Sequence, residues 1–164
     1  MVLLGSMGVG KTTIGGALAS RLGSSFTDVD ELIMHEAGEP VASLFERLGE
    51  ADFRRLERDI AVRALKAAPD RSVVSLGGGT FTDYDVRLEC RQRAKTIYLR
   101  AQPDVVLARL TSEEIASRPL LASNPSAALS ARHRARDPLY LSSDVVVNAE
   151  AALDEVLERV LPHA

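Results

Sequence analysis

Cysteine and long apolar runs are what this sequence has least of. Cys90 is the single cysteine, so the chain cannot form an intramolecular disulfide, which favours a reducing compartment. The apolar stretch that opens the chain covers residues 1–4 and stops at Gly5, too short for a signal peptide or a membrane-spanning helix. We therefore expect a cytoplasmic protein with no membrane contact.

An excess of charge of either sign is also missing. The 164 residues include 20 lysines and arginines and 23 acidic residues, which gives a formal net charge of −3. A protein with this balance has no overall electrostatic attraction for nucleic acid, so we expect no nucleic-acid partner. Any anionic ligand has to be held by basic side chains placed locally, which makes the positions of the arginines informative.

Repeats, low-complexity tracts and linkers are absent, so the length predicts a single domain over residues 1–164. Short β-rich runs alternate with segments of helical periodicity. The β-rich runs lie at 2–4, 25–28, 72–76, 96–99 and 144–147. Helical segments include 55–67, 103–110 and 151–161. This alternation predicts a three-layer α/β/α fold with a five-stranded parallel sheet that binds ligands at the carboxyl ends of its strands.

One region departs from this alternation. Between residues 110 and 136 no strand is predicted, and Pro119 and Pro125 are expected to interrupt any long helix. Four arginines lie within this region or at its end, namely Arg118, Arg132, Arg134 and Arg136. A long excursion near a ligand-binding edge predicts a mobile lid, at about 110–125. A helical hairpin with solvated charges is the alternative.

Residues 5–12 carry the most specific motif in the chain. They read Gly-Ser-Met-Gly-Val-Gly-Lys-Thr and match the phosphate-binding pattern G-x-x-x-x-G-K-[ST] between a predicted strand and a predicted helix. The glycines allow successive backbone N–H groups to point at phosphate oxygens, and the helix dipole adds to the attraction. The motif predicts a P-loop NTPase fold that binds ATP and Mg²⁺, with Lys11 on the β- and γ-phosphates and Thr12 on the metal ion. The nucleotide contacts are expected from Gly8, Val9, Gly10, Lys11, Thr12 and Thr13.

Motifs beyond the phosphate loop narrow the class of protein. A guanine-specific GTPase would carry an N-K-x-D motif after a late strand, and the sequence has none. Five other motifs follow in order: D-x-D at 28–30, G-E-x-x-F-R-x-x-E at 49–57, G-G-G at 77–79, R-P-L-L at 118–121 and R-x-P-L-Y at 136–140. In this order and at this spacing, they resemble the motifs of the shikimate kinase family. The resemblance covers almost the whole chain.

The motif residues also fit a phosphoryl-transfer site on physical grounds. Asp28 and Asp30 are two residues apart at the end of a predicted strand, so both carboxylates are expected to project to the same side. Arg54 and Glu57 are three residues apart on one helical face, where Glu57 can orient Arg54. The three glycines at 77–79 allow a ligand to approach the backbone N–H groups closely.

The resemblance implies an ATP-dependent kinase that transfers the γ-phosphoryl group to the 3-hydroxyl of shikimate, a step of aromatic amino acid biosynthesis. It implies three catalytic residues: Lys11, Asp30 on the attacking hydroxyl, and Arg118 of the lid over the transferring phosphate. Asp28 is implied to support Mg²⁺ with Thr12, and Arg109 falls near the family's adenine-stacking arginine. The acceptor is implied to contact Asp30, Arg54, Gly77, Gly78, Gly79 and Arg136, with the two arginines on its carboxylate.

Two alternatives stay open at this stage. A related P-loop kinase could act on another polyol or cyclitol, and Met34 stands where the family often has a glutamate. A neutral acceptor would leave the pair of Arg54 and Arg136 unexplained, which favours shikimate. A non-catalytic nucleotide-binding module would be expected to have lost its P-loop lysine, a metal ligand or the acid, and all are present. The sequence shows no obvious extra apolar surface, so we expect a monomer.

Overall fold

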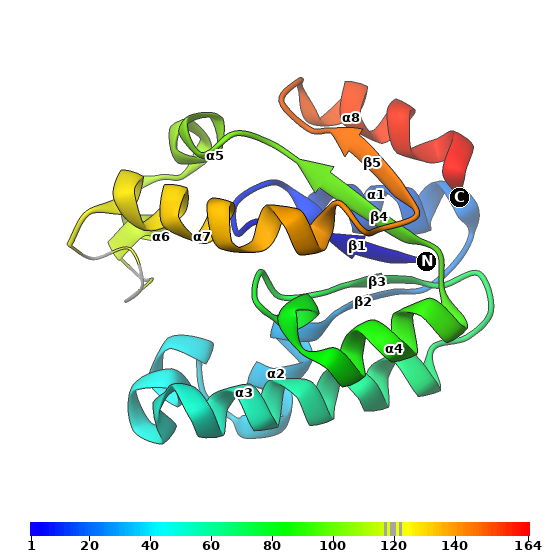
Figure 1. The fold of residues 1–164 in the computed structure, drawn as a ribbon. Coiled ribbons are helices and arrows are strands. Elements are labelled where there is room, and N and C mark those ends of the chain that lie inside the picture. Colours follow the sequence, from blue (N-terminus) through cyan, green and yellow to red (C-terminus); the bar gives the residue numbers. More distant parts are fainter. Residues whose placement is uncertain (117, 119–120, 122) are drawn as a thin grey trace.

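In a computed structural model, the protein is described at residues 1–116, 118, 121 and 123–164 (Figure 1). The strands are β1 (Val2–Leu4), β2 (Phe26–Asp28), β3 (Val73–Ser75), β4 (Thr96–Arg100) and β5 (Val145–Asn148). The α-helices are α1 (Lys11–Leu22), α2 (Val29–Ala37), α3 (Val41–Ala67), α4 (Tyr84–Arg93), α5 (Pro103–Arg109), α6 (Ser112–Ala116), α7 (Pro125–Tyr140) and α8 (Leu153–Val160). The described residues also form the 3₁₀ helices η1 (Thr80–Thr82) and η3 (Leu161–His163). Ser117, Pro119 and Leu120 of the expected lid motif lie outside the described residues.

The five strands form one parallel sheet in the order β2-β3-β1-β4-β5, which confirms the predicted five-stranded parallel sheet. The central strand, β1, pairs with β3 on one side and β4 on the other, so that Leu3 lies opposite Ser75 and Ile97. All the carboxyl ends of the strands therefore lie at one edge of the sheet. In such sheets the ligand site lies at this edge, here next to the loop that follows β1.

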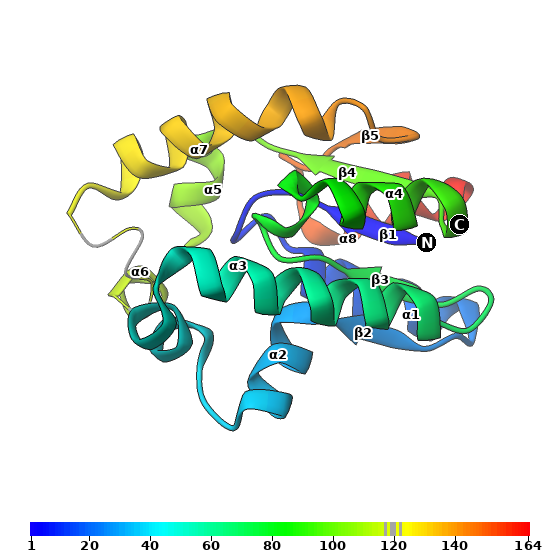
Figure 2. The ribbon, with the colours of Figure 1, turned by 60° about the horizontal axis from the view of Figure 1, so that its bottom comes forward.

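Helices cover both faces of the sheet (Figure 2). Leu3 joins the core beneath α1 and α8, whereas Val2 and Leu4 join the core beneath α2, α3 and α4. A strand that is buried on both faces needs apolar side chains at every position, which explains the continuous apolar runs of the sequence. None of the described helices is both long enough and apolar enough to cross a bilayer.

No described helix runs through Pro125, as expected, because Pro125 is the residue at which α7 begins. Pro125 stands in the first turn of α7, which has 16 residues, and the side chain of Asn124 caps this helix by accepting a hydrogen bond from the Ala127 N–H at 3.0 Å. Proline is well tolerated in a first turn, because the N–H that it lacks has no partner within the helix there. The R-x-P-L-Y segment at 136–140 forms the end of α7.

The strand predicted at 25–28 ends at Asp28, as expected, but Asp30 follows in a helix, so the two carboxylates do not alternate along a strand. Strand β2 ends at Asp28, whose carboxylate accepts a hydrogen bond from the Asp30 N–H at 2.9 Å and so caps α2. Asp30 lies in the first turn of α2. The helix expected at 55–67 is the second half of α3, which begins at Val41 and is interrupted by the positive φ of Gly49.

Candidate active site

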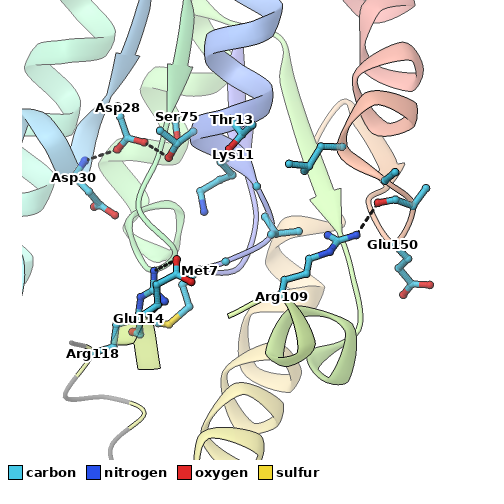
Figure 3. Close-up of a pocket in the computed structure, with 17 residues that line it drawn as sticks. Met7, Lys11, Thr13, Asp28, Asp30, Ser75, Arg109, Glu114, Arg118 and Glu150 are labelled. Atoms are coloured by element: carbon cyan, nitrogen blue, oxygen red, sulfur yellow. Dashed lines mark hydrogen bonds and ion pairs between the residues drawn. The ribbon is translucent and has the colours of Figure 1, made fainter. Parts of the chain in front are cut away.

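A cavity of about 710 Å³ opens against the phosphate-binding loop at the carboxyl edge of the sheet (Figure 3). We call it the loop-side cavity. Every residue that the sequence assigned to nucleotide or metal lines it, although these residues come from distant parts of the chain. They are Gly8, Val9, Gly10, Lys11, Thr12, Thr13, Asp28, Arg109 and Arg118.

The loop itself leaves the start of α1 open to a ligand. Gly10 is the N-cap residue of α1, has a φ of 101°, and provides no side-chain hydrogen bond to the first turn. A side chain at Gly10 would be strained at this φ, and its Cβ would lie 2.7 Å from Leu153 Cδ2. The free N–H groups and the positive end of the helix dipole together form an anion-binding site.

Lys11 closes the bottom of the loop-side cavity. Its Nζ donates hydrogen bonds to the carbonyl oxygens of Gly5 at 3.0 Å and Ser6 at 2.9 Å. Burial lowers the pKa of Lys11, and the carboxylates of Asp30 and Asp28 oppose this shift. The ammonium group is therefore held against the loop by its own carbonyls, in a position next to where phosphate would bind.

Thr12 and Asp28 form a direct pair at the base of the same cavity. The Thr12 hydroxyl donates a hydrogen bond to Asp28 Oδ2 at 2.7 Å, while Asp28 Oδ1 accepts from the Asp30 backbone. The described residues contain no cluster of three or more His, Cys, Asp or Glu side chains that could hold a metal ion. A hydroxyl beside one carboxylate is a donor set that suits Mg²⁺, a hard cation that keeps water and phosphate oxygens as its other ligands.

Asp30 lies where the loop-side cavity meets a second one. The second cavity has a volume of about 480 Å³, and we call it the α3-side cavity. Met7, Asp30 and Arg118 line both cavities. Burial raises the pKa of the Asp30 carboxyl to about 6, and Lys11 opposes the shift. Asp30 is thus an acid of intermediate strength that is ionised at neutral pH and able to accept a proton.

The α3-side cavity combines an apolar wall with two guanidinium groups. Its wall includes Met34, Val41, Ala42, Phe45 and Phe53, and its polar lining includes Arg54 and Arg136. Gly78 and Gly79 also line it. A cavity of this kind suits a small ring that carries a carboxylate, because the wall covers the ring and the arginines bind the anion.

Arg54 is held in place from several sides. Its Nη1 donates a hydrogen bond to Glu57 Oε2 at 2.6 Å, which is the contact expected from their spacing. The guanidinium carbon lies 5.5 Å from the centroid of the Phe53 ring and 5.9 Å from that of Phe45. A side chain at Gly79 would clash with it, since a Cβ there would lie 2.6 Å from Arg54 Nη1.

Arg136 reaches the α3-side cavity from α7 and is fixed by the glycine loop. Its Nη1 and the Tyr140 hydroxyl both donate hydrogen bonds to the carbonyl oxygen of Gly78. Burial raises the pKa of Tyr140 to about 12, so this hydroxyl remains a donor throughout the physiological range. The next residue, Asp137, accepts two hydrogen bonds from Arg100 at 2.9 Å each, which ties this end of α7 to β4.

Arg118 and Arg109 lie at the outer side of the loop-side cavity. Arg118 donates to the Glu114 carbonyl oxygen at 3.2 Å and pairs with the Glu114 carboxylate at 3.8 Å (Figure 3). Arg109 donates to the carbonyl oxygens of Ala149 and Ala151, both at 2.7 Å. Arg109 therefore links α5 to the loop after β5.

Gly77 is the one expected acceptor contact that does not line the α3-side cavity. It is buried behind the cavity, and a Cβ there would lie 2.5 Å from Asp30 Oδ1 and 2.8 Å from Thr80 Oγ1. Sequence reasoning missed Thr80, Tyr140 and Met7. Tyr140 could have been identified, because it belongs to the R-x-P-L-Y motif, and Met7 stands at a variable position of the phosphate-loop motif; no local pattern marks Thr80.

The fold and these two adjoining cavities define the class of protein. A phosphate-binding loop at the carboxyl edge of a parallel sheet, with a small-molecule cavity that opens onto the same acid, is the arrangement of a P-loop kinase for a small molecule. The shikimate kinase family model matches residues 7–163. The chain therefore belongs to the shikimate kinase family and is an ATP-dependent kinase.

Individual relatives agree with this assignment. The chain is 38% identical over 162 residues to a shikimate kinase of Cereibacter sphaeroides, covering 98% of this chain and 79% of that protein. The shikimate kinase of Acinetobacter baumannii, solved in complex with shikimate, is 31% identical with a TM-score of 0.87 over 99% of this chain and 92% of the other. A gluconokinase from Sinorhizobium meliloti, at 19% identity and a TM-score of 0.62, shares the fold.

Proposed function

We propose that this chain transfers the γ-phosphoryl group of ATP to a hydroxyl of shikimate. The observation that carries the proposal is the position of Asp30, at the junction between a cavity built around a phosphate-binding loop and a cavity with two guanidinium groups. A triphosphate in the first cavity and a hydroxylated carboxylate in the second would meet at this acid. The shikimate complex of the A. baumannii relative supports the choice of acceptor.

Binding and orientation of the acceptor fall to the α3-side cavity. Arg54 and Arg136 would hold the carboxylate of shikimate, and the aromatic rings of Phe45 and Phe53 would cover its ring. With the carboxylate fixed at one end, a hydroxyl at the opposite end is directed to Asp30. Fixing the acceptor in this way turns a bimolecular reaction into one within a single complex, which accounts for much of the rate enhancement of kinases.

Asp30 would accept the proton of the attacking hydroxyl. The hydroxyl oxygen forms a bond to the γ-phosphorus, the bond between that phosphorus and the β–γ bridging oxygen breaks, and ADP leaves with the electron pair. The proton of the hydroxyl moves to the Asp30 carboxylate. Because the pKa of this carboxyl is about 6, Asp30 is ionised at neutral pH and is a stronger base than an ordinary aspartate.

Lys11 and Arg118 would stabilise the negative charge of the phosphates during transfer. Lys11 already lies on the loop, and the phosphates would take the place of the Gly5 and Ser6 carbonyls as its partners. Arg118 lines both cavities and can therefore contact the group that passes between them. Thr12 and Asp28 would hold Mg²⁺, which when bound neutralises charge on the β- and γ-phosphates.

A coupled assay of ADP release tests the proposal directly. The enzyme is given Mg·ATP with shikimate, quinate, gluconate, a neutral cyclitol or no acceptor, and the phosphorylated product is identified by ³¹P NMR. We expect turnover with shikimate far above the rest of the panel, and loss of turnover in Lys11→Ala. Strong turnover with another acceptor, and little with shikimate, would overturn the proposed acceptor while keeping the kinase.

A further inference from the structure

The carboxylate that holds Arg54 is itself held by a residue of another element. Glu57 is 4% exposed, and its two oxygens have different partners. Oε2 accepts from Arg54 Nη1 at 2.6 Å, and Oε1 accepts from the Thr80 hydroxyl at 2.7 Å. Thr80 is 1% exposed and belongs to η1, directly after the glycine loop. The chain of contacts thus runs from η1 through α3 to the acceptor cavity.

The glycine loop shields this chain of hydrogen bonds from water. A Cβ at Gly77 would lie 2.8 Å from Thr80 Oγ1 and 3.0 Å from Glu57 Oε1, so the bare backbone of Gly77 packs directly over the bond between them. The Thr80 N–H donates to the Gly77 carbonyl oxygen at 3.1 Å, which fixes η1 against the loop. Because Thr80 and Glu57 are almost fully buried, a water molecule could replace a lost Thr80 hydroxyl only at a considerable cost in free energy.

A carboxylate with one oxygen fixed has little freedom to rotate. If the Thr80 donor is lost, Glu57 can turn toward Arg54 with both oxygens and engage the guanidinium in two parallel hydrogen bonds. Such an arrangement would use N–H groups of Arg54 that a ligand carboxylate needs. With Oε1 engaged by Thr80, Glu57 meets Arg54 through Oε2 alone.

We propose that Thr80 is a positioning residue for the acceptor: its hydroxyl fixes the Glu57 carboxylate so that Arg54 presents its remaining N–H groups to the acceptor carboxylate. This inference rests on the proposed function, since it assumes that the α3-side cavity binds shikimate. Thr80 itself touches neither substrate. Its effect should therefore appear in the affinity for the acceptor and leave the phosphoryl transfer step nearly unchanged.

Three substitutions at Thr80 separate the hydroxyl from the shape of the side chain. Thr80→Val keeps the shape and removes the donor, Thr80→Ala removes both, and Thr80→Ser keeps the donor. We expect Val and Ala to raise KM for shikimate about tenfold, with kcat and KM for ATP within about twofold of wild type, and Ser to stay close to wild type. Titration calorimetry of shikimate into the nucleotide-free proteins should show the same loss of affinity.

Thr96→Val provides a matched control. Thr96 is also buried, at 4% exposure, and its hydroxyl donates to a carboxylate, Asp144 Oδ2, at 2.7 Å. Thr96 lies outside both cavities, so Thr96→Val should lower the stability of the protein without changing KM for shikimate. If Thr80→Val fails to fold, the comparison of Thr80→Ala with Thr80→Ser decides the question.

The outcomes of the experiment are distinct. An unchanged KM for shikimate in Thr80→Val and Thr80→Ala would overturn the inference, and so would an equal rise in Thr80→Ser. A parallel fall of kcat and a rise of KM for ATP would also overturn it, because they indicate a general structural role. Absence of shikimate turnover in the wild-type enzyme would instead overturn the proposed function.

Discussion

Arg54 and Arg118 both line the α3-side cavity, and they are held in different ways. Their side chains are about equally exposed, at 28% and 30%. Arg54 is fixed by residues of its own helix and by the glycine loop after β3, through Glu57 and Gly79. Within the described residues, the side-chain hydrogen bond and ion pair of Arg118 both go to Glu114, four residues earlier.

We expect this difference to separate a preformed binding group from a group that is repositioned during the reaction. Arg54 has partners on α3 and next to the glycine loop, so its geometry should be complete before any ligand arrives. The side-chain partner of Arg118 lies on its own short segment around α6, so we expect Arg118 to shift with this segment. We therefore expect Arg54 to contribute to acceptor affinity and Arg118 to contribute to the rate of transfer.

The two largest effects are expected from Arg118→Ala and Asp30→Asn. Arginines that stabilise a transferring phosphoryl group contribute a factor of about 10³ or more to kcat. We expect kcat to fall by about this factor, while the dissociation constant of shikimate for the nucleotide-free enzyme stays unchanged. Arg134→Ala is the matched control, since Arg134 is exposed on α7 and lines neither cavity. A large loss of shikimate affinity in Arg118→Ala would remove the distinction between the two arginines.

Asp30→Asn should reduce kcat by about 10² to 10⁴, the usual contribution of a general base. The same substitution should stabilise the protein at neutral pH. The folded-state pKa of Asp30, about 6, lies above its ordinary value of 3.8, so the folded state binds the proton more tightly than the unfolded state. Stability is therefore lost as the pH rises from about 4 to about 6.

Asparagine has no carboxylate to ionise, so Asp30→Asn does not lose stability as the pH rises from about 4 to about 6. We expect it to be more stable than wild type by on the order of 2 kcal/mol at pH 7.5 and to show no gain at pH 3.5. Thermal unfolding at the two pH values measures the difference. A variant that is active and no more stable at pH 7.5 would refute both the role and the environment assigned to Asp30.

Arg54→Lys should act on the acceptor alone. Lysine keeps the charge but cannot hold a carboxylate with two parallel hydrogen bonds, and it cannot keep the contact with Glu57 in the same geometry. We expect KM for shikimate to rise about thirtyfold with kcat reduced by less than about threefold. Arg55→Lys is the control, because Arg55 pairs with Asp52 on the exposed face of α3. A loss of ATP affinity with an unchanged KM for shikimate would show that Arg54 acts on the nucleotide and not on the acceptor.

The pH dependence of the wild-type enzyme should follow Asp30. Protonation below a pKa of about 6 removes the base, so kcat/KM for shikimate should fall about tenfold from pH 7 to pH 5. Asp30→Asn, which has no carboxyl group there, should show low activity without this acid limb. An acid limb of the same shape in both proteins would assign the titration to another group.

Gly79→Ala should give the smallest effect and tests how tightly Arg54 is seated. A Cβ at Gly79 would lie 2.6 Å from Arg54 Nη1, so the guanidinium has to shift. We expect a rise of a few-fold in KM for shikimate. Gly16→Ala is a matched control on α1, since a Cβ there meets nothing within 4 Å. Equal behaviour of the two variants would show that Arg54 is not confined by the glycine loop.

The sequence predicts the site better on its nucleotide side than on its acceptor side. The phosphate loop is a contiguous motif whose residues act together, so the residues assigned to it line one cavity. The acceptor side is assembled from α2, α3, the glycine loop and α7, and its supporting residues are fixed by tertiary contacts. Thr80 illustrates this limit, because only the folded chain brings its hydroxyl to Glu57.

One argument from the sequence fails for a local reason. The expectation that the Asp28 and Asp30 carboxylates project to the same side used the alternation of a strand, but the Asp28 side chain caps α2, so Asp30 lies on a helix. The residue at which a helix begins depends on capping contacts, such as that of Asn124 at the start of α7, which a hydrophobic pattern does not contain.

The most direct test of this account is the binding of shikimate to the nucleotide-free enzyme, measured by titration calorimetry in wild type, Arg54→Ala and Arg118→Ala. We expect that the wild-type protein binds shikimate, that Arg118→Ala binds it with the same affinity, and that Arg54→Ala loses most of this affinity. Equal weakening in both variants would contradict the preformed acceptor side. Absence of binding to a wild-type enzyme that turns over shikimate would contradict it as well, because the site would then form only after ATP has bound.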